Sequence, residues 1–291
     1  MDIPLVDTID LEILMHRDVH FGGNFSIMLE YYEKDGVGTM PDFESPRIKK
    51  LLLEEEKLGQ NLSEVLLPEQ ARERVEEAKN MYLSLRDIYE DKNTTKLSIL
   101  ISDLILSEEN YPEKEIKALS AHGKAAVKPL VDLLHTDKLY DPLFPGYGRT
   151  PIFSAEVLSN IKDEKAIPPL FEAMGQENFF TDEAMIMALS SFGNTARKFL
   201  IRRMVHLPIS RDNEHAAIVL TSMPECSEIA NACLTLLKDQ DVRNNESFAN
   251  YLILGCSGLK SDVQKDEFKK IAKGLNGFIK FEMNLIAKAW D

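Results

Sequence analysis

Cysteines, long apolar runs and basic residues near the N-terminus are all scarce in this sequence. The three cysteines among 291 residues, Cys226, Cys233 and Cys256, are odd in number, which predicts neither a disulfide framework nor a clustered metal site. No uninterrupted apolar run approaches the roughly 20 residues that a membrane-spanning helix needs. Asp2 and Asp7 precede every basic residue, unlike the start of a secretory leader. These absences predict a cytoplasmic protein without a membrane span.

Glycine and proline are also too few for the many turns of a strand-rich protein, at 14 and 13 residues. Hydrophobic residues make up 44% of the chain and charged residues 28%, which is ordinary globular composition and excludes a wholly disordered chain. The composition therefore favours a helical globular protein.

The formal charge of −14 is unevenly distributed along the chain. Residues 1–110 contain 12 Lys and Arg against 24 Asp and Glu, a net −12, and residues 111–291 carry the remaining −2. Such a charge repels nucleic-acid phosphate and anionic membranes, so neither is expected as a partner. The asymmetry predicts an acidic helical region over 1–110 and a second region over 111–291.

Five segments of the acidic region have the apolar periodicity of a helix. They are residues 8–16, 24–33, 46–57, 68–89 and 95–106, with Ser45 as the expected N-cap of the third. We expect these helices to cover the first unit of the region that follows, because the end of a repeat array needs a cap. A separate acidic domain on a flexible joint is the alternative.

One apolar register recurs along the second region. Ala at the start of a segment is followed by Leu or Cys four residues later and by Leu or Met eight residues later, with Ile replacing Ala in the fourth copy. This spacing places the three positions on one face of a helix. The copies are Ala126, Leu130 and Leu134; Ala166, Leu170 and Met174; Ala196, Leu200 and Met204; Ile229, Cys233 and Leu237.

Each copy forms the second helix of a pair, and another apolar helix precedes it as the first. Gly123, Asp163 or Gly193 stands at the turn between the two helices. Pro129 and Pro169 are expected in the first turn of the second helix. The paired helices and the Ala-Val/Ile-x-Pro-Leu-x-x-x-Leu/Met pattern resemble HEAT-like repeats of the short bacterial type, also found in phycobilin lyases. The resemblance implies an all-α protein built as an α-solenoid of antiparallel helix pairs, with residues 277–290 as a terminal capping helix. A plain helical bundle is the alternative.

Residues 141–151 lengthen the spacing between the first two copies, and insertions in repeat arrays form loops that often bind partners. The predicted contact residues in this loop are Phe144, Tyr147 and Arg149, because solvent-exposed aromatic side chains favour burial against a binding partner. The alternative is that the loop folds back on its own solenoid.

Lys198 and Arg202 belong to a basic second helix, and second helices line the concave surface in the family that the chain resembles. They are predicted to bind an acidic group of another protein or peptide. A solvated or internally paired face is the alternative.

Catalytic and metal-binding patterns are weak in this sequence. His16 and His20 have the spacing of a zinc-binding helix, but no third ligand is near, so we expect a solvated pair at the end of a helix and no metal. No catalytic residue and no cofactor is predicted. The expected function is a non-enzymatic protein-binding scaffold; the alternative is a lyase-type or other enzyme on the same scaffold, with Arg202, His206 or His215 among its polar groups.

Overall fold

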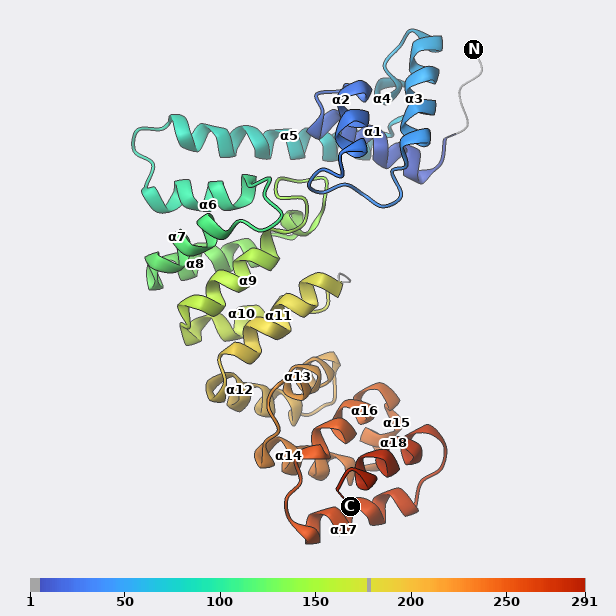
Figure 1. Ribbon diagram of the computed structural model, residues 1–291, viewed down its shortest axis with the longest axis vertical. Coiled ribbons are helices and arrows are strands. Elements are labelled where there is room, and N and C mark those ends of the chain that lie inside the picture. The colour runs from blue at the N-terminus through green and yellow to red at the C-terminus, as the bar shows by residue number, and fades with distance from the viewer. Residues whose placement is uncertain (1–5, 177–178, 291) are drawn as a thin grey trace. The chain divides into compact units, whose positions relative to one another are not determined.

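The computed structural model describes residues 6–176 and 179–290, and within these ranges the protein is all-α. The described chain forms 18 α-helices and three short 3₁₀ helices, without a strand (Figure 1). It divides into two compact units, Met1–Val157 and Leu158–Asp291. No helix among the described residues is long and apolar enough to cross a membrane.

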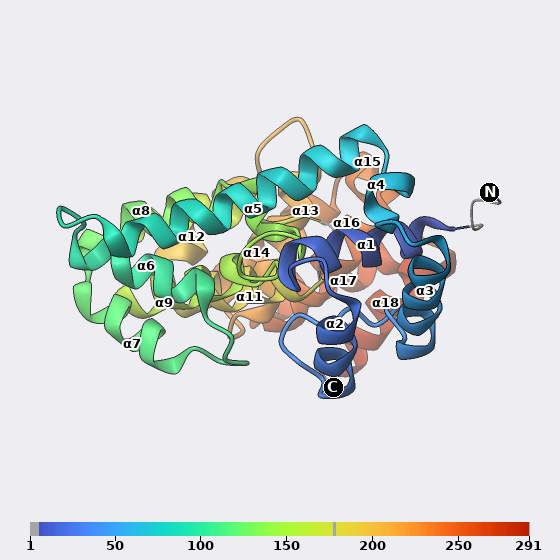
Figure 2. The same ribbon diagram turned by 90° about the horizontal axis from the view of Figure 1, so that it is seen from above.

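The N-terminal unit begins with six helices and continues through three more, the last of which extends past its end. The six are α1 (Thr8–His20), α2 (Phe25–Glu33), α3 (Ser45–Leu58), α4 (Leu62–Leu66), α5 (Glu69–Glu90) and α6 (Lys96–Leu106). α7 (Glu113–His122), α8 (Lys124–Leu134) and α9 (Thr150–Ile161) follow. The long helix α5 contacts both α1 and α6, as Figure 2 shows for α6. α5 therefore packs against a helix that precedes it in the chain and against the helix that follows it.

The five helices predicted for residues 1–110 are all present, with differences in their bounds, capping and number. Ser45 is the first helical residue, because the N-cap is Glu44, which makes no side-chain capping hydrogen bond. The five-residue helix α4 was not predicted, since so short a segment has no measurable periodicity. Asn24 and Thr95 cap α2 and α6 through their side chains, as their residue types favour.

The C-terminal unit consists of helices joined by short connections. They are α10 (Ile167–Glu172), α11 (Phe179–Ser191), α12 (Asn194–Met204), α13 (Arg211–Ser222), α14 (Ser227–Leu237), α15 (Gln240–Asn244), α16 (Glu246–Gly255), α17 (Asp262–Lys273) and α18 (Gly277–Lys288). Within this unit α11 contacts α13, α13 contacts α16, and α16 contacts α18. The first helices of the predicted pairs, α11, α13 and α16, thus pack on one another in chain order, and the predicted capping helix α18 packs on the last of them.

The recurring apolar register is confirmed by burial. All twelve register positions, from Ala126 to Leu237, are at most 7% exposed. The turn between the two helices of a pair is confirmed as well: Gly123 and Gly193 cap α8 and α12, and Asp163 caps the 3₁₀ turn before α10. Pro129 departs from expectation, because α8 begins at Lys124 and the proline lies inside it rather than in the first turn.

Shortening a register side chain should destabilise the protein. Leu170 and Leu200 are completely buried, so Leu170→Ala and Leu200→Ala should each lower the free energy of unfolding by about 2–5 kcal/mol. Urea denaturation followed by circular dichroism measures the change. Leu207, which is 68% exposed, offers a matched control, and Leu207→Ala should have little effect. Unchanged midpoints for both buried positions would contradict the register.

Candidate functional site

The loop between α8 and α9 holds three of the predicted contact residues, and its first aromatic ring is buried. Phe144 is 3% exposed and packs in the core of the N-terminal unit with residues of α1 and α5, including Ile13 and Val75. Lys138 lies 5.6 Å from the centre of the Phe144 ring. Phe144 therefore offers no contact area to a partner, and its ring packs on the N-terminal helices rather than on the solenoid that the alternative named.

Tyr147 is half-buried and packs against α1. Its ring centre lies 4.7 Å from that of His20. The backbone at Gly38 passes so closely beneath the Tyr147 ring that a Cβ there would come within 2.4 Å of it, so only glycine fits. Burial raises the pKa of Tyr147 to about 12, and the phenol stays protonated at neutral pH.

Arg149 and Asp141 anchor the two sides of the same loop. The Arg149 guanidinium donates to the main-chain carbonyls of Ser107 and Glu109, at 3.1 Å each. The Asp141 carboxylate accepts a 2.7 Å hydrogen bond from Arg74 on α5. These hydrogen bonds hold the loop against the rest of the N-terminal unit, so the donor groups of Arg149 that make them are not available to a partner.

The expectation that His16 and His20 are solvated is wrong. α1 continues to His20, His16 is 3% exposed, and the two ring centres are 5.3 Å apart. Burial lowers the pKa of His16 to about 3 and that of His20 to about 4. Both imidazoles are therefore neutral at pH 7.

His20 has both of its ring nitrogens engaged. Nε2 lies 3.3 Å from the carbonyl oxygen of Pro142, which only accepts, so Nε2 carries the proton and donates. Nδ1 then accepts from the Tyr82 hydroxyl at 3.1 Å. His20 consequently joins α1, α5 and the loop, and has no nitrogen left to bind a metal or to act as a general base. No cluster of three or more metal-ligating side chains occurs among the described residues.

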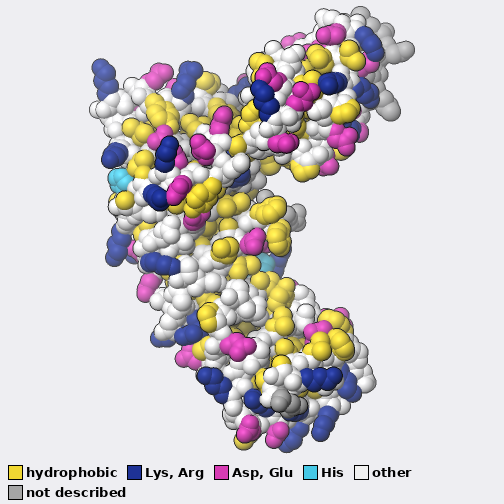
Figure 3. Space-filling view, in the orientation of Figure 1, with side chains coloured by type: hydrophobic (Ala, Val, Ile, Leu, Met, Phe, Trp, Pro, Cys, Tyr) yellow, Lys and Arg dark blue, Asp and Glu magenta, His cyan; other side chains and the backbone are white. Residues whose placement is uncertain are grey.

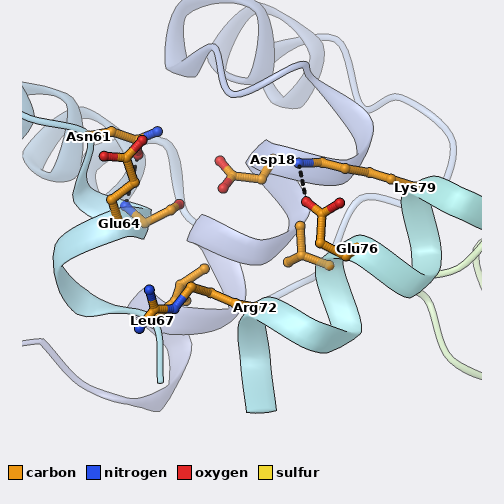
Figure 4. Close-up of a pocket in the computed structure, with 9 residues that line it drawn as sticks. Asp18, Asn61, Glu64, Leu67, Arg72, Glu76 and Lys79 are labelled. Carbon is orange, nitrogen blue, oxygen red and sulfur yellow. Dashed lines mark hydrogen bonds and ion pairs between the residues drawn. The ribbon is translucent and has the colours of Figure 1, made fainter. Parts of the chain in front are cut away.

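A surface pocket of about 290 Å³ lies beside the end of α1 (Figure 4). Charges of both signs line it, with Asp18 and Glu64 among the carboxylates and Arg72 and Lys79 among the cations. Lys79 is paired with Glu76 at 3.4 Å. The side-chain oxygens of Asn61 and Ser63, which also line the pocket, already accept hydrogen bonds from the buried Arg17. Several of its polar groups are therefore already engaged within the protein, and its lining carries side chains of both charges, which favours no ligand of one sign.

Lys198 and Arg202 lie one turn apart on α12, and both are exposed. The Arg202 Nε donates to the main-chain carbonyl of Lys198 at 3.2 Å, but neither cation has a carboxylate partner among the described residues. Val205 and Leu207, which are 41% and 68% exposed, follow them along the chain. We call these four residues the α12 basic surface.

Other arginines of the same helix are neutralised inside the unit. Arg197 lies 3.5 Å from Glu228, and Arg203 lies 3.4 Å from Asp212. Arg203 also lies over the rings of Phe171 and Phe199, 5.6 and 5.2 Å from their centres. The alternative of a solvated or internally paired face thus fits Arg197 and Arg203, which are paired, while Lys198 and Arg202 are exposed and open to solvent or to a partner.

The side chains considered for catalysis are not joined into a reactive group. Burial raises the pKa of Cys233 to about 12, and it raises that of Cys256 as well, so both thiols are protonated at neutral pH. Within the described chain, no hydrogen bond joins the side chains of Arg202, His206 and His215. His215 is half-buried, and burial together with Arg211 lowers its pKa.

No family model matches the chain, and no curated protein is similar to it in sequence.

One exposed feature was missed at the sequence level. Phe278, Phe281 and Leu285 of α18 are 55%, 58% and 45% exposed, although α18 was expected to be a plain capping helix. The available signal was a second set of apolar residues, Phe278, Phe281 and Leu285, at helical spacing beside the buried Ile279 and Met283.

Proposed function

We propose that this protein is a non-enzymatic scaffold of HEAT-like helix pairs that binds an acidic segment of another protein through the α12 basic surface. The supporting observation is that Lys198 and Arg202 are exposed and lack carboxylate partners in a chain of net charge −14, whereas Arg197 and Arg203 beside them are paired. Exposed cations without a carboxylate partner on an acidic chain attract the carboxylates of other molecules.

The repeat character supports this function. The twelve buried register positions and the packing of successive first helices within the C-terminal unit are what a HEAT-like α-solenoid requires. Val205 and Leu207, which follow the two cations along the chain, are exposed and offer apolar area of the kind that protein interfaces use. Loop residues Phe144, Tyr147 and Arg149 are excluded from the proposed surface, because their side chains serve the N-terminal unit.

Reversing the two charges should abolish capture of the partner. With the purified chain as bait and bound proteins identified by mass spectrometry, Lys198→Glu/Arg202→Glu should reduce recovery of the specific partner about tenfold or more. Both side chains are exposed, so the melting temperature should stay unchanged. Lys92→Glu/Lys96→Glu, at two other exposed positions, matches the change in net charge and should retain the partner.

Equal recovery by wild type and the charge-reversed variant would refute the α12 basic surface. A stoichiometric pigment, metal or nucleotide in the purified protein would instead favour an enzyme of the lyase type on the same scaffold. Absorption spectroscopy and elemental analysis of the same sample make that comparison.

A further inference from the structure

The outer face of α18 carries a row of exposed apolar side chains. Phe278, Phe281 and Leu285 are spaced three and four residues apart, which places them along one side of the helix. All three are exposed, while Ile279 and Met283 are buried in the unit. A contiguous row of large exposed apolar side chains marks an interaction site rather than ordinary surface.

An open pocket of about 470 Å³ lies alongside this row, between α17 and α18. Both helices contribute to it, and we call it the α17/α18 groove. Its lining residues are Lys269 and Lys273 from α17, and Phe281, Asn284, Leu285, Ala287 and Lys288 from α18. From Phe281 to Lys288 the groove follows α18 for about 10 Å, which matches two turns of a helix laid along it.

The charge of the groove is opposite to that of the chain. Its described lining contains three lysines, Lys269, Lys273 and Lys288, and no Asp or Glu, in a protein of net charge −14. Lys273 and Lys288 at the rim are exposed and have no ion-pair partner in the described part of the chain. On the visible face of the C-terminal unit, Figure 3 shows hydrophobic and basic side chains next to one another.

We infer that the α17/α18 groove binds an amphipathic helix of a partner protein, with carboxylates flanking its apolar stripe. Apolar side chains of that helix contact Phe281 and Leu285, and its carboxylates pair with Lys273 and Lys288. The packing order supports a helical occupant: α13 packs on α11, α16 on α13 and α18 on α16, so a helix on α18 repeats a contact already used in the unit.

Two other occupants fit the surface less well. A bilayer presents a flat face and leaves a concave groove between two helices unfilled. A second copy of the chain, placed about a two-fold axis, would bring the lysines of both rims together. The groove is a separate surface from the α12 basic surface, and it extends the proposed binding function to a partner of defined shape and charge.

Fluorescence anisotropy with synthetic peptides tests the inference on the full chain. The probe is a labelled helical peptide of about 18 residues, with leucines at helical spacing and glutamates on both flanks. We expect it to bind at least about tenfold more tightly than the same peptide with lysines in place of the glutamates. Phe281→Ser/Leu285→Ser and, separately, Lys273→Glu/Lys288→Glu should each weaken binding by about tenfold or more.

The substituted residues are exposed or at the rim, so unchanged melting temperatures should accompany the loss. Val263, which is 78% exposed on α17 and outside the groove lining, provides the matched control Val263→Ser, with affinity retained. Lys198→Glu/Arg202→Glu should also retain peptide affinity, which separates this result from a failure of the α12 basic surface.

Any one of the following outcomes would overturn the inference. One is equal affinity of wild type and both groove variants for the acidic peptide, or no binding at all. Another is wild-type binding to phosphatidylserine-containing vesicles that Phe281→Ser/Leu285→Ser abolishes. The third is a dimer, seen by light scattering, that the same substitutions dissociate.

Discussion

Lowering the pH from 7 to 5 is expected to cost the protein about 4 kcal/mol of stability through His16 and His20 alone. In the unfolded chain each imidazole takes up a proton near pH 6.5, whereas burial holds the folded pKa values at about 3 and about 4. The unfolded state therefore binds more protons than the folded state below pH 6.5. The contribution of the two histidines to the free energy of unfolding is therefore fully present above pH 6.5. It is lost as the pH falls toward their pKa values in the folded state.

The surroundings of the two rings offer no charge that would reverse this sign. His16 lies edge-on to Phe43, 5.1 Å between ring centres, and His20 packs against Tyr82 and Tyr147. Asp141 is the carboxylate that raises both pKa values, and its effect is smaller than that of burial. Arg74, which binds Asp141, acts on His16 in the opposite direction.

Urea denaturation at a series of pH values measures this dependence. His16→Leu removes one of the two proton-binding sites, so the loss between pH 7 and pH 5 should fall by about half. His135 is exposed, and His135→Leu should leave the pH dependence as it is in the wild type. A wild-type stability that is flat from pH 7 to pH 5 would show that the imidazoles are not buried in their neutral form.

Arg17→Ala is expected to lower the free energy of unfolding by about 3–5 kcal/mol, because the substitution leaves buried polar groups unpaired. The Arg17 side chain is completely buried. Its guanidinium binds Glu55 at 2.6 Å and Asp18 at 2.7 Å and lies 4.4 Å from the centre of the Phe25 ring. It also donates to Asn61 and Ser63, so one side chain connects α1, α3 and α4.

Two further substitutions distinguish the charge of Arg17 from the geometry of its hydrogen bonds and provide a surface control. Arg17→Lys keeps the charge but loses the planar fork, so it should recover only part of the stability. Lys34→Ala breaks an ion pair whose two side chains are both 69% exposed, and it should have little effect. Wild-type denaturation midpoints for Arg17→Ala would mean that water replaces the guanidinium without penalty.

The sequence by itself determined most of the longer helices and the face that each copy of the apolar register buries. Helix formation and apolar periodicity depend on residues three and four positions apart, which are local in the chain. For this reason the triplet Ala196, Leu200 and Met204 was predicted from spacing, and each of the three is completely buried. Glycine at the turn, as at Gly123 and Gly193, is a local signal of the same kind.

Only the tertiary structure decided which polar and aromatic side chains remain available to a partner. His20 binds the carbonyl of Pro142, which lies 122 positions away, and Phe144 enters a core made with α1 and α5. Arg197 and Lys198 are neighbours in the sequence, yet Arg197 pairs with Glu228 on α14 and Lys198 does not. Burial and ion pairing depend on which elements meet in space, and no local spacing encodes that.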